Sequence, residues 1–216
     1  MEIIRRITVF GVIQEGIGIG LKNTLSLIAA VLLWILTIWI PYLNVGTTIA
    51  IMTIPVALSK GEMISPLFIF EAKYRRYMGE FFTLIGLMSL AIIPALFFVI
   101  IPGIVISIGW SLAVYILLDK GVAPGEAMIG SNQATYGYKW TIFGVRFVLG
   151  LAFYILFAIF AFIPFLGGIL IFVLLLVYMV ASLGCTAVIY RNLTTEGPIV
   201  TPKVPAEGVK TETPAE

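Results

Sequence analysis

Long apolar runs separated by short polar stretches dominate the pattern along this chain. Six runs are long enough to cross a bilayer, whose hydrocarbon core of about 30 Å requires about 17–25 helical residues. Apolar and polar residues do not alternate within the runs, which indicates helices rather than the strands of a membrane barrel. The pattern therefore predicts an all-α, polytopic membrane protein with about six transmembrane helices, at residues 21–40, 42–58, 81–101, 102–118, 141–163 and 167–190.

Two stretches outside these runs combine apolar and basic residues. At the start of the chain, isoleucines lie on one helical face, and Arg5 and Arg6 lie off it. Residues 62–80 place aromatic rings among Lys73, Arg75 and Arg76. This distribution is typical of amphipathic helices that lie in the membrane interface.

The same pattern divides the chain into three parts. We expect an interfacial helix over residues 1–20 and a six-helix transmembrane domain over residues 21–193. From residue 194 onward the chain is rich in Pro, Thr, Glu and Lys and lacks apolar periodicity. Such a composition predicts a disordered cytoplasmic tail over residues 194–216.

Charged residues occur on only one side of the predicted helices. All 13 Lys and Arg residues fall at the chain start, after the second and fourth spans, near the start of the fifth, or after the sixth. The other connections are uncharged turns that contain Pro41, Pro102 and Pro164. Because basic residues are retained on the cytoplasmic side, we predict a multi-pass protein of the cell (plasma) membrane with both termini in the cytoplasm.

The uncharged turns also indicate a repeat. Each contains an Ile-Pro pair, at a nearly constant interval, and Lys60-Gly61 and Lys120-Gly121 recur at a similar interval. We interpret this as three tandem hairpins of the same orientation. The alternative is that proline recurs at helix ends because it is tolerated there.

Composition narrows the function classes. The chain is 61% hydrophobic and 11% charged, with no His and one Cys, whereas soluble domains are about 45–50% apolar and about 25% charged. A His-dependent triad is excluded, and we expect no metal site and no cofactor. The net charge of +2 does not indicate nucleic acid as a partner. The spans carry no paired carboxylates, so we expect no catalytic residues and no enzyme.

Arg146 is the most informative single residue, because an ionisable side chain within a span is costly. It lies near the start of the fifth span, on nearly the same helical face as Lys139. Three roles are open for it: anchoring to lipid phosphate at the interface, an internal pair with Asp119 or Glu126, and a part in transport.

A glycine-rich stretch, Gly16-Ile17-Gly18-Ile19-Gly20, invites comparison with phosphate-binding loops. No strand precedes it, Asn23 occupies the third glycine position of the dinucleotide motif, and no Gly-Lys-Ser/Thr follows. We therefore expect a flexible joint between the interfacial helix and the first span.

Several short motifs lie in the second half of the chain: Ile101-Pro102-Gly103-Ile104, Asp119, Glu126-Ala127, Ser131, Gly137-Tyr138-Lys139-Trp140, Phe143 and Tyr190-Arg191-Asn192-Leu193. In these the chain resembles a broad group of uncharacterised prokaryotic six-helix membrane proteins. The group includes the membrane domain fused to some glycerophosphodiester phosphodiesterases. The resemblance covers nearly half of the chain by motif and the first half by layout. The resemblance implies a six-helix fold and a plasma-membrane location, and it implies no catalytic residues. The phosphodiesterase domain is not in this sequence, so we do not expect a lipid-degrading role.

These observations favour a non-catalytic membrane module whose partners are membrane lipids, other membrane proteins or a second copy of itself. Anionic headgroups attract basic side chains at the membrane surface. The predicted lipid-headgroup or interfacial anchors are Lys73, Arg75, Arg76, Lys139 and Arg146. The alternative is a small transporter or channel, because Arg146 lies in a span and Pro55 and Pro94 can kink spans.

Overall fold

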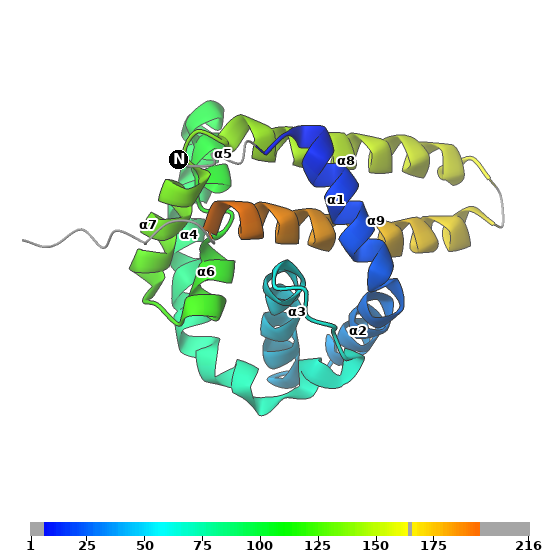
Figure 1. The fold of residues 1–216 in the computed structure, drawn as a ribbon, viewed down its shortest axis with the longest axis horizontal. Helices are drawn as coiled ribbons and strands as arrows, with labels where there is room; N and C mark the ends of the chain where they lie inside the picture. The colour runs from blue at the N-terminus through cyan, green and yellow to red at the C-terminus, as the bar shows by residue number, and fades with distance from the viewer. Residues whose placement is uncertain (1–6, 164–165, 195–216) are drawn as a thin grey trace, which may run out of the picture.

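The computed structural model describes residues 7–163 and 166–194, and all regular structure in this part of the chain is helical. The α8–α9 pair projects from the rest of the molecule, and α1 lies across it (Figure 1). The elements are α1 Val9–Lys22, α2 Thr24–Thr37, α3 Leu43–Ser59, η1 Pro66–Phe70, η2 Ala72–Tyr77, α4 Met78–Phe98, α5 Ile100–Gly109, α6 Ala113–Lys120, α7 Pro124–Thr135, α8 Lys139–Ala161 and α9 Gly167–Thr194.

Four helical stretches in the described residues are long and apolar enough to cross a membrane: η2 with α4, α5 with α6, α8, and α9. The α1–α2 pair would be a fifth if counted as one span, but it is bent by 79°. Helix α3 has 17 residues, the lower limit for a span. The chain is therefore an all-helical protein with four to five long apolar helices, and the predicted count of six is not confirmed.

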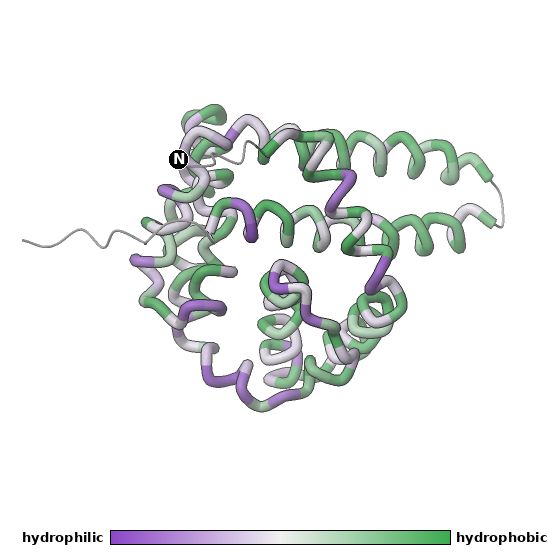
Figure 2. The backbone as a smooth tube through the Cα atoms, in the orientation of Figure 1, coloured by the Kyte–Doolittle hydropathy of each residue, from purple (hydrophilic) through white to green (hydrophobic). Residues whose placement is uncertain are grey.

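Helices α8 and α9 form a hairpin that is apolar along most of its length (Figure 2). Phe153 and Tyr178 pack across it, with ring centroids 4.7 Å apart. Large apolar side chains such as Leu151, Ile155 and Val177 are exposed on its outer surface. Lipid solvates such helix faces directly, so this hairpin has the surface of a membrane-embedded element.

Glycines allow α1 to cross α9 in close contact. A Cβ atom on Gly184 would lie 2.1 Å from the carbonyl oxygen of Gly16, and one on Gly20 would lie 3.0 Å from Val180. Gly16 and Gly20 are one turn apart, which is the small-xxx-small spacing of close helix crossings in membranes. The prediction of a flexible joint at these glycines is therefore wrong. They lie within a continuous helix, and the chain bends after it, at Asn23.

The stretch from α5 to α6 is interrupted after Gly109, and α7 supplies the missing hydrogen-bond partners. The buried Ser131 hydroxyl donates to the Gly109 carbonyl (2.7 Å) and accepts from the Leu112 N–H (3.1 Å). The buried Thr135 hydroxyl donates to the same carbonyl (3.2 Å). Backbone groups freed in apolar surroundings need such partners, so α7 stabilises the break.

Helices α2 and α3 pack side by side around a small polar contact. The hydroxyls of Thr37 and Thr47 are buried 2.8 Å apart. The Trp34 indole N–H donates to the Thr48 hydroxyl (3.0 Å). The 62–77 segment, which contains η1 and η2, packs against both helices.

Both Lys-Gly pairs of the sequence repeat end a helix in the same conformation. Gly61 and Gly121 have φ angles of 75° and 61°, which glycine adopts without steric cost. The Gly61 and Glu62 N–H groups return to carbonyls of the last turn of α3 (3.1 and 3.0 Å), as in a Schellman motif. The Gly121 N–H returns to Leu117 (2.9 Å). The recurrence therefore reflects a shared helix-ending turn.

Candidate functional site

Three of the predicted anchors lie on η2, and each has a different environment. Lys73 forms an ion pair with Glu71 (2.6 Å) and lies over the ring of Tyr74. The half-buried Arg75 places its Cζ atom 5.9 Å from the centroid of the Tyr42 ring. Arg76 is exposed and has no ion pair within the described residues. Of the three, Arg76 is therefore the most available to an external anion.

The other two anchors lie on the first turns of α8. Lys139 donates to the Asn132 side-chain oxygen (3.1 Å). Arg146 is exposed and forms no ion pair with any described residue. Three aromatic rings pack along the same turns of α8: Trp140 contacts Phe143 edge-to-face (6.1 Å), and Phe143 stacks on Phe147 (5.8 Å). We call Trp140, Phe143, Arg146 and Phe147 the α8 stripe.

The structure brings the five predicted residues together as two groups rather than one. Residues 72–77 follow the lower edge of the molecule in the view of Figure 1, whereas α8 follows the upper edge. The η2 residues and the α8 residues can therefore contact lipid independently of each other.

The internal pair considered for Arg146 does not form. Asp119 instead has Lys60 and Tyr190 as partners. The Glu126 carboxylate accepts from the Ala123 N–H (3.4 Å) at the start of α7. Of the three predicted roles, interfacial anchoring and transport remain.

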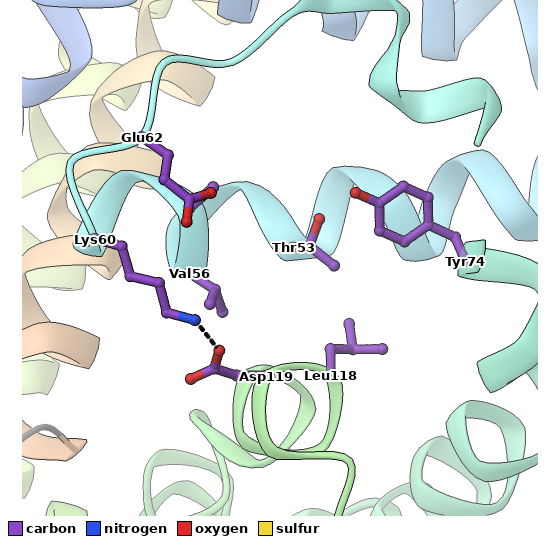
Figure 3. Close-up of a pocket in the computed structure, with 8 residues that line it drawn as sticks. Thr53, Val56, Lys60, Glu62, Tyr74, Leu118 and Asp119 are labelled. Atoms are coloured by element: carbon purple, nitrogen blue, oxygen red, sulfur yellow. Dashed lines mark hydrogen bonds and ion pairs between the residues drawn. The ribbon is translucent and has the colours of Figure 1, made fainter. Parts of the chain in front are cut away.

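The sequence did not predict the polar network around Asp119. The Asp119 carboxylate accepts an ion-paired hydrogen bond from Lys60 and a second hydrogen bond from the Tyr190 hydroxyl (2.6 Å). Its side chain is 14% exposed. Lys60 follows α3 and Tyr190 belongs to α9, so the network joins three helices at their charged ends. Figure 3 shows Lys60 and Asp119 facing each other across the gap between α3 and α6.

A polar cleft of about 180 Å³ adjoins this pair. Thr53, Glu62 and Tyr74 also line it, so α3, α6 and the 62–77 segment all contribute (Figure 3). Its size suits a few water molecules or a small polar solute. The two carboxylates and one ammonium leave a small excess of negative charge.

A third ion pair, between Glu15 and Arg191, joins α1 to α9 beside the glycine crossing. Cys185 is buried at that crossing, next to Gly16, where it packs as a small apolar side chain. Both contacts join segments far apart in sequence. No local motif indicated them.

The described residues contain no group of three or more His, Cys, Asp or Glu side chains placed to hold a metal ion. No family model, curated protein or solved structure matches the chain. The resemblance to six-helix prokaryotic membrane proteins therefore stays a prediction.

Proposed function

We propose that this chain is a non-catalytic integral membrane protein that interacts with anionic lipid headgroups. The observation that carries the proposal is the α8 stripe, where Arg146 is exposed, has no ion pair with a described residue, and shares the first turns of α8 with Trp140, Phe143 and Phe147. Trp140 is 85% exposed. Aromatic rings are enriched at the headgroup level, and an Arg near the end of a span extends its guanidinium to the same level.

Phosphate recognition is the chemistry that suits this stripe. The guanidinium is planar and permanently charged, and it matches the oxygens of a phosphate in a bidentate geometry. Lys139 lies on nearly the same face of α8 and adds a second positive charge. Basic residues near an anionic surface are each worth about 1 kcal/mol, so this pair supports selectivity rather than tight binding.

Several other ionisable groups near the charged ends of the helices contact one another within the fold. Asp119 binds both Lys60 and Tyr190, and Glu15 binds Arg191. A network of this kind stabilises helix packing. This supports a module for lipid or membrane-protein partners rather than an enzyme.

We place the protein in the cell membrane with both termini in the cytoplasm. The support is the one-sided distribution of Lys and Arg along the sequence, which follows the positive-inside rule. Under this proposal the α8 stripe faces the cytoplasmic leaflet, whose lipids carry negative charge.

A small transporter or channel is the second candidate, and the polar cleft beside Asp119 favours it. The break between α5 and α6 does not add to this case, because α7 already satisfies its backbone groups. Solute flux into reconstituted vesicles that is lost in Asp119→Asn, with the fold intact, would favour this candidate.

Lipid titration followed by native mass spectrometry tests the main proposal. Wild-type protein in mild detergent should bind phosphatidylglycerol more tightly than phosphatidylcholine. Arg146→Ala should weaken phosphatidylglycerol binding about fivefold, the equivalent of about 1 kcal/mol. Arg146→Lys keeps the charge and is the matched control, so its loss should be smaller. Equal phosphatidylglycerol binding by wild type and Arg146→Ala would contradict the proposal.

A further inference from the structure

The turn between α2 and α3 lies at the same end of α3 as Arg75 of η2. Arg75 lies 5.9 Å from the ring of Tyr42, which precedes α3. Its Cγ atom would be 2.9 Å from a Cβ on Gly46, in the first turn of α3. The 62–77 segment therefore leaves the C-terminal end of α3 and returns along the helix to its N-terminal end.

This path does not fit a first hairpin that crosses the membrane and returns. If α3 crossed the membrane, the 62–77 segment would have to cross beside it, and Arg75 would lie on the uncharged side. Residues 62–65 are not helical, and Glu62 and Met63 are exposed. Lipid-exposed irregular backbone does not occur in the hydrocarbon region, and charged side chains there are costly.

Tyr42 itself is held in an unusual conformation. Its φ and ψ angles are 68° and −47°, and the Leu43 N–H donates to the Pro41 carbonyl (2.8 Å), which makes a strained γ-turn. It is the one non-glycine residue with positive φ in the described part of the chain. Strained residues persist where surrounding contacts fix them and cluster at binding sites, and here Arg75 covers the ring.

We infer that α2 and α3 stay on the charged side of the membrane without crossing it. On that side, the α2–α3 turn and η2 form one surface for anionic lipid headgroups. Trp39 is 87% exposed and suits the headgroup level, while exposed cations on η2 match the lipid charge. The contact between Arg75 and Tyr42 is the centre of this surface, with the exposed Trp39 on the same turn and the exposed Arg76 next to Arg75.

The inference changes the membrane topology. Four helical stretches are left to cross: η2 with α4, α5 with α6, α8, and α9. Because this number is even, both termini stay on one side. The inference rests on the proposed membrane location, but not on the lipid preference of the α8 stripe, so the two can fail separately.

Labelling of single cysteines in membrane vesicles of known orientation tests the placement. The background is Cys185→Ala, and the label is a membrane-impermeant maleimide. Ala123→Cys marks the charged side, and Phe162→Cys marks the tip of the α8–α9 hairpin; both positions are exposed. Trp39→Cys should react in the vesicles in which Ala123→Cys reacts. If Trp39→Cys instead reacts in the vesicles in which Phe162→Cys reacts, the inference is overturned.

A cross-link tests the helix contact on which the placement rests. In the same background, Gly46→Cys with Arg75→Cys should form a disulfide under mild oxidation, because the two side chains adjoin at the N-terminal end of α3. The control pair, Gly46→Cys with Glu62→Cys, has its second cysteine beyond the other end of α3 and should not cross-link. Failure of the Gly46–Arg75 pair to cross-link, or equal cross-linking by both pairs, would overturn the inference.

Discussion

Asp119 illustrates how single polar contacts act at the charged end of the molecule. Lys60 is 51% exposed, so water screens its ion pair, which contributes at most about 1 kcal/mol. The Tyr190 hydroxyl donates over 2.6 Å in a part-buried setting, and a hydrogen bond to a charged acceptor contributes about 1.5–3 kcal/mol. The tyrosine contact should therefore dominate the stability that Asp119 provides.

A double-mutant cycle measures that contribution. SDS-induced unfolding in mixed micelles would be compared for Asp119→Ala, Tyr190→Phe and the double variant. We expect a coupling free energy of about 1.5–3 kcal/mol. Lys60→Ala should cost about 1 kcal/mol or less. Additive effects of the two single variants would show that the hydrogen bond does not stabilise the fold.

At the scale of the elements, the crossing of α1 over α9 depends on the absence of side chains. Gly184 meets the backbone of Gly16, which cannot move aside as a side chain can. The bend at Asn23 then turns the chain away from α9 toward α3. A tight crossing and a sharp bend together fix where α2 begins.

Alanine substitutions test this crossing. Gly184→Ala should destabilise the protein by about 1–3 kcal/mol or more, because its Cβ overlaps the Gly16 carbonyl. Gly18→Ala is the matched control: nothing lies within 4 Å of its Cβ position. Alanine is favoured over glycine in a helix by about 0.5–1 kcal/mol. Equal effects of both substitutions on unfolding would contradict the close crossing.

The sequence predicted helices that consist of one long apolar run. It did not predict contacts between residues that are far apart in the chain. Helices α8 and α9 lie close to the predicted 141–163 and 167–190, because uninterrupted apolar runs of that length leave no alternative in lipid. Arg146 is distinctive in the sequence because a lone charge in such a run is rare, and its role stays a prediction. The Asp119–Tyr190 contact and the position of Arg75 beside Tyr42 arise from tertiary packing. No periodicity encodes them.

At the scale of the whole molecule, the charged residues of the α8–α9 hairpin lie away from its tip. The tip carries Phe162, Ile163 and Leu166, whereas the opposite ends of these helices carry Lys139 and Arg191. This polarity orients the hairpin in a bilayer. The α8 stripe then lies at the level of the headgroups, which is the central claim of the proposed function.

Depth-dependent fluorescence quenching of Trp140 tests that claim most directly. Wild type and Trp140→Phe would be reconstituted in vesicles of phosphatidylcholine and phosphatidylglycerol that contain lipids brominated near the headgroup or near the chain end. The difference between the two proteins isolates Trp140. We predict that bromines near the headgroup quench this difference signal more strongly than bromines at the chain end. No quenching by either lipid, or stronger quenching from the chain end, would contradict an interfacial α8 stripe.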